Sequence, residues 1–225
     1  MRHIHPVGIQ EKFVASGRYH HPYVIHWTIH EMPDGAWMIR LDQDGRDSDG
    51  TSLLVEAWRS PIAEGGKIAR FDIWGYGNKT HRIQQVKARY FITDNTLEVG
   101  IQFGNSPQTT QSIPFPQNAI LIPDIPLFWG FAIQPIMAQG GKGTIFSCLI
   151  NFDIPEAFSA TITEKEILSF GDDEIHIGDK PTPAKKFLMD ANHFVWIDDL
   201  GVVLAYINTN STTEVIKNYA RRPKR

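Results

Sequence analysis

The sequence predicts an all-β protein: a curved antiparallel sheet or an open barrel, with one short helical insert near residues 124–137. Three observations predict this class. Apolar and polar residues alternate with a period of two from about residue 23 to residue 103, the pattern of strands that bury one face. Turn signals rich in Gly, Asp and Asn interrupt this alternation. A second series of alternating runs follows an apolar segment that contains several prolines.

The first series of runs predicts a meander of antiparallel strands that spans residues 22–104. The runs occupy residues 23–30, 36–42, 53–59, 67–76, 83–91 and 96–103. The turns between them contain Pro33-Asp34-Gly35, Asp49-Gly50, Gly65-Gly66, Gly77-Asn78 and Asp94-Asn95. Because short turns of this composition join antiparallel neighbours, consecutive runs should lie side by side.

The apolar insert at residues 118–141 should contain a short buried helix. Asp124 is expected to cap this helix, and Pro126 stands in its first turn, where a missing N–H is tolerated. Gly140-Gly141 should stop the helix, and Pro135 should kink it or end it early.

The prolines of the insert also disfavour strand pairing over residues 121–137. We therefore expect this stretch to pack as a lid or plug against a sheet, with Phe128 and Trp129 facing a ligand cavity. The polar residues 104–117 would form a mobile approach that lets the lid open.

Strand patterns resume after the insert and predict a second meander over residues 143–208. Its runs occupy residues 144–152, 159–170, 173–177, 185–189 and 193–207, with Asp198-Asp199-Leu200-Gly201 as the tight turn of the last hairpin. The basic residues at 217–225 are expected to form a solvated tail. A chain of 225 residues fits one large all-β domain or two small ones. Because all-β barrels and sandwiches of this size commonly form one domain, residues 1–225 are expected to form a single β domain.

Composition restricts the partners and the compartment. The net charge of −3 gives no attraction to nucleic acid, and no apolar run approaches the roughly 20 residues of a membrane span. The single Cys148 excludes an intramolecular disulfide and is expected to be a buried small hydrophobe. The first residues lack the apolar core of a signal peptide, so we expect a cytoplasmic protein. No cofactor motif is found, and the sequence does not fix the oligomeric state.

A resemblance to a known family comes from the last third of the chain. It is carried by Phe194-Val195-Trp196-Ile197-Asp198-Asp199-Leu200-Gly201-Val202-Val203-Leu204-Ala205-Tyr206, by the strand Glu174-Ile175-His176-Ile177-Gly178 and by Lys185-Lys186-Phe187. This part of the chain resembles bacterial half-barrel proteins of the DUF3108 and glycolipid-binding types. The resemblance implies a curved sheet that wraps an apolar cavity, a shape similar to that of lipoprotein carriers.

Alternation within the first meander assigns residues to two faces. One face is uniformly apolar and should be core; it carries Trp37, Ile39, Leu41, Leu53, Val55, Ala57, Ala69, Phe71 and Ile73. The other face mixes charged with aromatic or apolar residues; it carries His26, Met38, Arg40, Asp42, Leu54, Glu56, Trp58, Ile68, Arg70, Asp72, Trp74 and Tyr76.

The mixed face has two interpretations. It could be a solvated surface on which Arg40, Glu56, Arg70 and Asp72 pair across strands. It could instead line a pocket in which Trp58, Trp74 and Tyr76 hold an apolar ligand, while Arg40, Arg70, Glu56 and His26 orient the polar end of that ligand.

Metal binding has weak support, and no metal site is predicted. In a strand, His26 and His30 would lie about 13 Å apart and could not share one ion. Residues 42–50 contain four Asp but lack the spacing of a calcium-binding EF-hand, and an Asp/Gly-rich hairpin turn explains the same residues. The pairs His3/His5 and His20/His21 could bind metal only adventitiously.

These observations favour binding of an apolar or amphipathic small molecule in a lipocalin-like pocket between the sheet and the insert. An alternative is a cofactor-free isomerase, cyclase or hydratase on the same scaffold, with His26, Glu56 and Asp72 as acid and base groups inside the barrel. A structural or interaction module with an exposed aromatic face is a further alternative.

Overall fold

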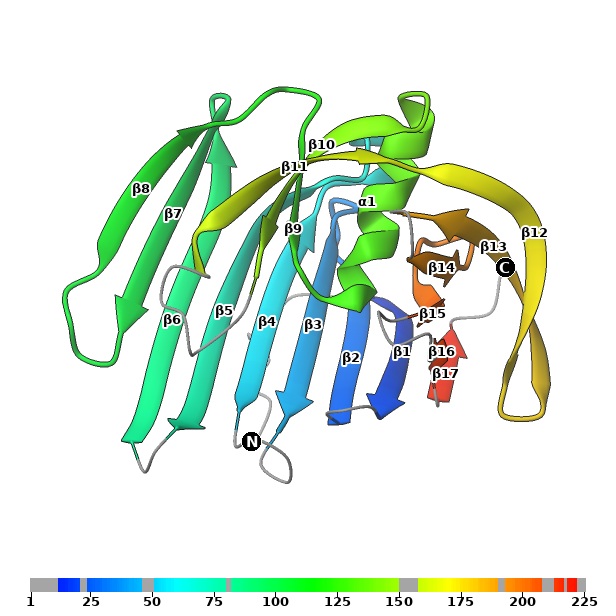
Figure 1. Cartoon of the computed structure of the whole chain (residues 1–225), viewed down its shortest axis with the longest axis horizontal. Helices are drawn as coiled ribbons and strands as arrows, with labels where there is room; N and C mark the ends of the chain where they lie inside the picture. Colours follow the sequence, from blue (N-terminus) through cyan, green and yellow to red (C-terminus); the bar gives the residue numbers. More distant parts are fainter. Residues whose placement is uncertain are drawn as a thin grey trace.

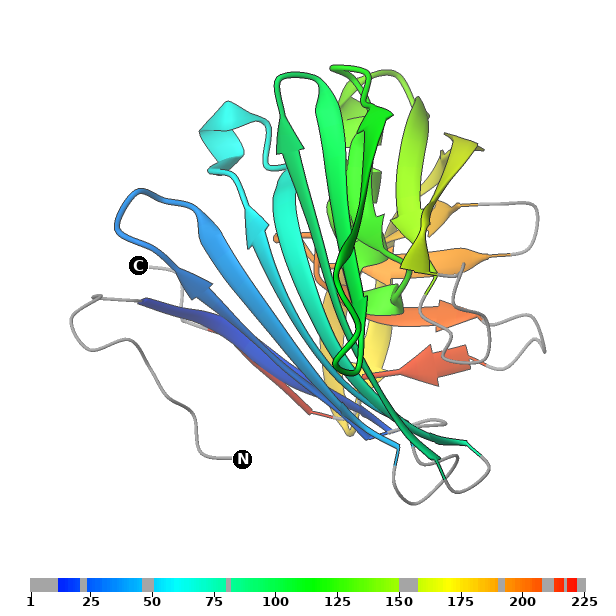
Figure 2. The same cartoon turned by 90° about the vertical axis from the view of Figure 1, so that its left-hand side faces the viewer.

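The computed structural model describes residues 12–20, 24–45, 51–79, 82–149, 158–189, 193–207, 213–216 and 218–221. These residues form three β-sheets, one α-helix and a short 3-10 turn, which agrees with the predicted all-β class (Figure 1). The largest sheet is twisted and curved, and the other elements lie on one side of it (Figure 2).

The largest sheet has nine strands in the order β17-β1-β2-β3-β4-β5-β6-β7-β8, and all neighbours are antiparallel. Its strands are β1 (Lys12–His20), β2 (Val24–Glu31), β3 (Trp37–Asp44), β4 (Ser52–Arg59), β5 (Ile68–Lys79), β6 (Arg82–Thr93), β7 (Thr96–Phe103), β8 (Thr109–Pro114) and β17 (Asn218–Arg221). The edge strands β17 and β8 do not pair with each other. Within the described residues the sheet is therefore open, which agrees with the predicted curved antiparallel sheet.

The predicted second meander is divided between two smaller sheets. A three-stranded sheet contains β9 (Ile120–Pro123), β10 (Lys142–Cys148) and β11 (Ala160–Glu166). A five-stranded sheet contains β12 (Leu168–Ile177), β13 (Lys180–Leu188), β14 (Phe194–Ile197), β15 (Val203–Ile207) and β16 (Thr213–Val215). The predicted turn at Asp198 to Gly201 joins β14 to β15, where the Gly201 N–H donates to the Asp198 carbonyl.

Helix α1 (Pro126–Ala138) forms within the predicted insert. Pro126 occupies the first turn, and Gly140 and Gly141 follow the helix with φ of 91° and 85°, so both predicted boundary signals are confirmed. Pro135 lies inside the helix and does not end it. Eight residues of α1 are buried, and tertiary packing of this kind outweighs the local penalty of a proline. No helix in the described part of the chain is long and apolar enough to cross a membrane.

The core lies between the nine-stranded sheet and the elements that cover it. The apolar rows of β3 and β4 are buried as predicted, with Ile39, Leu41, Val55 and Ala57 fully inaccessible. Helix α1 packs on this face, where the Phe131 ring meets the Trp37 ring edge to face at 6.5 Å.

A β-bulge changes the predicted faces at the start of β5. The register between β4 and β5 shifts next to Trp58 and Arg59, so Ile68 pairs with Arg59. Ile68 is therefore buried in the core, whereas Ala69 is exposed. The prediction had these two residues on the opposite faces, because it extended one strict alternation along the whole strand.

Three further segments differ from the sequence prediction. Residues 120–123 form strand β9, which pairs in parallel with β10 although Pro123 ends it. The polar approach at 104–117 contains strand β8 at the edge of the large sheet. Residues 218–221 of the expected tail form β17, which pairs with β1. Strand β9 can pair because its proline, Pro123, is its last residue. The polar residues of β8 and the basic residue of β17 fit into the sheet because both are edge strands.

Candidate functional site

The mixed face of the first meander lies on the side of the sheet away from α1. Val55 and Ile73, which alternate with Glu56 and Trp74, are fully buried on the face that α1 covers. Arg59 on that face contacts the Phe131 ring of α1 at 5.0 Å. Trp58, Trp74 and the other residues of this row therefore do not line a space between the sheet and the insert, and this part of the prediction is wrong.

The mixed face instead carries a network of ion pairs. Arg40 contacts Asp42 at 3.1 Å and Glu56 at 3.2 Å. Asp72, with only 4% of its side chain exposed, accepts from Arg70 at 2.5 Å and from Arg89 at 3.1 Å.

Stacking explains how this outer face tolerates an aromatic residue. The Arg70 guanidinium lies 4.6 Å from the centre of the Trp58 ring, so the long cationic side chain covers the aromatic surface. Trp74 is half-buried and Tyr76 is exposed. This arrangement matches the first interpretation of the mixed face, a solvated surface with paired charges.

The three proposed acid and base residues do not form one group. Glu56 and Asp72 are directly opposite each other on β4 and β5. His26 lies on β2, exposed and opposite Asp42 of β3. Two strand spacings, roughly 10 Å, separate the backbones of β2 and β4, and the open sheet has no barrel interior for these groups to face.

The described residues offer no support for metal binding by the histidine pairs or by the Asp-rich loop at residues 42–50. Residues 46–50 of the Asp-rich loop, His3, His5 and His21 lie outside the described residues. Among the residues that are described, no three His, Cys, Asp or Glu side chains gather closely enough to hold a metal ion.

The two predicted ligand-binding residues of the insert lie in different surroundings. Phe128 is fully buried, with its ring 6.3 Å from that of Phe131, so it supports the core. Trp129, the next residue of the helix, is half-buried and lines a cleft.

This cleft, which we call the Trp129 cleft, has a volume of about 380 Å³ and lies between the three-stranded sheet and the first turn of α1. Its apolar wall consists of Ile122, Trp129, Ile145, Leu149 and Met189. Its polar residues are Asp124, Ser147, Thr161, Thr163, Lys165 and His193. One face of the three-stranded sheet thus forms a wall, in which Ile122 of β9 and Ile145 of β10 are apolar, whereas Ser147 of β10 and the residues of β11 are polar.

The Trp129 side chain is held in a fixed orientation. Its indole N–H donates to Asp124 Oδ1 at 3.1 Å, so Asp124 orients this ring instead of capping α1, whose N-cap is Ile125. The indole also meets the rings of Tyr206 and His193 edge to face, at 5.5 and 6.1 Å. Sequence reasoning selected Trp129 but missed the rest of the cleft, although the alternation of residues 145, 147 and 149 indicates a shared face.

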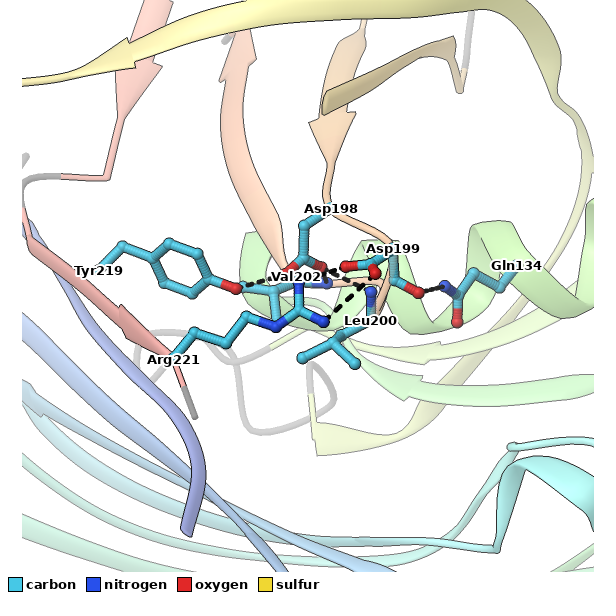
Figure 3. Close-up of polar contacts among 7 residues, drawn as sticks. All are labelled: Gln134, Asp198, Asp199, Leu200, Val202, Tyr219 and Arg221. Atoms are coloured by element: carbon cyan, nitrogen blue, oxygen red, sulfur yellow. Dashed lines mark hydrogen bonds and ion pairs between the residues drawn. The ribbon is translucent and has the colours of Figure 1, made fainter. Parts of the chain in front are cut away.

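A second cleft, of about 640 Å³, lies beside the turn between β14 and β15 and contains a buried carboxylate. Asp198 Oδ1 accepts from the backbone N–H groups of Leu200 at 2.9 Å and Val202 at 2.8 Å (Figure 3). The Tyr219 hydroxyl donates to Asp198 Oδ2. Burial raises the pKa of Asp198 above its ordinary range, and these hydrogen bonds oppose the shift only in part. Because its oxygens already accept these bonds, Asp198 stabilises the turn and is not an available general base.

Neighbouring contacts connect this turn to the rest of the molecule. Arg221 on β17 donates to both carboxylate oxygens of Asp199, and Gln134 of α1 donates to the Asp199 carbonyl at 3.4 Å (Figure 3). Arg59 on β4 donates to Gln134 Oε1 at 2.9 Å. A series of hydrogen bonds therefore joins the large sheet, the helix and the five-stranded sheet, and the residues that form it stabilise the fold.

The cysteine is buried, as predicted. Cys148 is fully buried, and its Sγ lies 2.7 Å from the Tyr90 hydroxyl. Burial raises the pKa of this thiol to about 12. A thiol of this kind is not a nucleophile near neutral pH.

Comparison of the chain with protein-family models, curated proteins and solved structures finds no match. The similarity of the last third to half-barrel proteins therefore stays an expectation.

Proposed function

We propose that this chain binds an amphipathic small molecule in the Trp129 cleft. The observation that carries the proposal is the position of Trp129, half-buried in the cleft wall and oriented by Asp124. A rigid indole offers a large apolar contact at little cost in conformational entropy. The ligand's apolar part would lie against Trp129, Ile145 and Met189.

Polar groups at the same cleft define the other end of the ligand. Lys165 and His193 can donate hydrogen bonds, and Thr161 and Thr163 can donate or accept them. A volume of about 380 Å³ lies within the usual range for small-molecule sites. A compact ligand with one apolar face and one polar or anionic end suits this distribution.

The acid–base enzyme alternative has less support, because His26, Glu56 and Asp72 line neither the Trp129 cleft nor the cleft at Asp198. For location we propose the cytoplasm, since the one cysteine is buried and the fold depends on no disulfide.

A fluorescent probe can test the binding proposal. We expect 8-anilinonaphthalene-1-sulfonate, which has an apolar ring system and an anionic group, to bind the native chain saturably. Trp129→Ala should weaken this binding at least about tenfold, because the aromatic wall is lost. Trp74→Ala is the matched control: it removes an indole from the outer face and should leave the affinity unchanged.

Two results would contradict the proposal. Equal affinities for the wild type and Trp129→Ala would remove the cleft as the binding site. A loss of affinity in Trp74→Ala alone would return the site to the mixed face. Far-ultraviolet circular dichroism of each variant shows whether the sheet is intact.

A further inference from the structure

Three aromatic rings surround one ammonium group on the five-stranded sheet. The Lys186 Nζ lies 4.6 Å from the ring centre of Phe194, 5.0 Å from that of Trp196 and 6.0 Å from that of Phe170. We call Phe170, Phe194 and Trp196 the aromatic cage. All three distances lie within the range of cation–π attraction.

Strand register builds the cage from three neighbouring strands. Lys186 on β13 is directly opposite Trp196 on β14. Phe194 stands two residues before Trp196, so both rings point to the face that carries Lys186. Phe170 belongs to β12, the other neighbour of β13 (Figure 1).

A β-bulge brings the third ring to this face. Ser169 pairs with Phe187 and Gly171 pairs with Lys186, so Phe170 is the extra residue between them. Gly171 has a φ of 87°, a conformation that glycine adopts without strain. Bulges of this kind redirect a side chain and are common next to functional sites.

A carboxylate completes the rim of the cage. The Trp196 indole N–H donates to Asp173 Oδ2 at 2.7 Å, and the Glu174 N–H donates to Oδ1 at 2.9 Å. These hydrogen bonds, the one from Trp196 most of all, lower the pKa of Asp173. The cage therefore combines aromatic faces with a negative charge, the two features that attract an organic cation.

The rings are positioned independently of the lysine. The Phe170 and Phe194 rings meet edge to face at 5.5 Å, and the Phe194 and Trp196 centres are 6.4 Å apart. Phe170 is 56% exposed, which is unusual for a phenyl ring. The side of the cage that Phe170 forms is therefore open to solvent. Lys186 has a flexible four-carbon stem and can leave without moving the rings.

We propose that the aromatic cage binds a quaternary ammonium group, which displaces Lys186 as the resident cation. A quaternary ammonium group exposes no N–H and is weakly hydrated, whereas the lysine ammonium is compact and strongly hydrated. The ligand therefore loses less hydration than Lys186 on entering the cage. Free choline and the headgroup of phosphatidylcholine share this chemistry.

This site is separate from the proposed function. None of the cage residues lines the Trp129 cleft or the cleft at Asp198. Lys185, the preceding residue on β13, points to the opposite face and lines the Asp198 cleft. Failure of either proposal leaves the other intact.

The test titrates the full chain with choline chloride and follows the indole N–H resonance of Trp196 by NMR, with sodium chloride as the ionic-strength control. We expect a saturable shift in the wild type. Lys186→Ala removes the competing cation and should tighten choline binding roughly tenfold. Lys185→Ala removes the same charge from the opposite face and should match the wild type.

Removal of one ring tests the cage itself. Phe194→Leu keeps an apolar side chain but should abolish the choline-dependent shift, also in combination with Lys186→Ala. The absence of a saturable shift in the wild type, or equal binding by Phe194→Leu, would overturn the proposal. Sedimentation with phosphatidylcholine vesicles then identifies the source: binding that Phe194→Leu removes indicates the lipid headgroup, and choline binding without vesicle binding indicates a free cation.

Discussion

Gly130→Ala should test the close approach between α1 and the turn that joins β14 to β15. A Cβ atom at position 130 would lie 2.1 Å from the Gly201 carbonyl oxygen and 3.1 Å from Ile197 Cγ2. Because non-bonded contacts of this kind require about 3 Å, the helix and the turn would have to separate by roughly 1 Å. The hydrogen bonds of Asp198 and Gln134 lie at the same junction.

Two opposing effects set the size of the change. Replacing glycine by alanine inside a helix stabilises it by about 1 kcal/mol, whereas overpacking costs about 1–3 kcal/mol. The atom that Cβ would meet belongs to the backbone and cannot rotate away, which places the penalty at the upper end of its range. The net loss is about 2 kcal/mol, equivalent to a Tm lower by about 4–8 °C in a chain of this size.

Urea and thermal denaturation followed by circular dichroism measure this loss. Ala138→Gly is the control, because Ala138 is exposed at the end of the same helix and reports mainly helix propensity. It should destabilise by less than about 1 kcal/mol. If Gly130→Ala is as stable as the wild type or more stable, the inferred contact between helix and turn is wrong.

Three further outcomes follow from the buried groups. Cys148 should not react with a thiol reagent at pH 8 in the native chain and should react fully in denaturant, since its pKa is raised to about 12; rapid native labelling would contradict this burial. Phe128→Ala should lower the free energy of unfolding by about 3–5 kcal/mol, because the ring is fully buried; a loss below 1 kcal/mol by urea denaturation would disprove its core role. Asp198 has a folded pKa above its unfolded value, so its contribution to stability is present at low pH and declines as pH rises from about 4 through the folded pKa. The stability of the wild type minus that of Asp198→Asn should therefore fall over that window, and a difference that rises with pH would refute the direction of the shift.

Strands β2 to β7 of the large sheet were predictable because alternation is a local property of each strand. Ile39, Leu41 and Val55 are buried as their alternation predicts. The reversal at Ile68 and Ala69 was not predictable in the same way. A bulge is a relation between two strands, and neither strand alone contains a signal for it.

The candidate site was less accessible to sequence reasoning. Two tryptophans on a charged face suggested a pocket, but a stacked guanidinium explains Trp58 without one. The Trp129 cleft combines α1 with Leu149 and Met189, which are far apart in the sequence. Only the packing of three separate segments brings these residues together, and no local pattern encodes that packing.

The pairing of β1 with β17 has a consequence for biosynthesis. On a ribosome, β1 emerges early, but the strand that covers its outer edge comprises residues 218–221. The Tyr19 hydroxyl on β1 likewise donates to the carbonyl of Val203, which is made much later. The nascent chain therefore carries an open strand edge until residues 218–221 emerge, a state in which chains can pair with the wrong partner. This sheet can be completed only after residues 218–221 have been made.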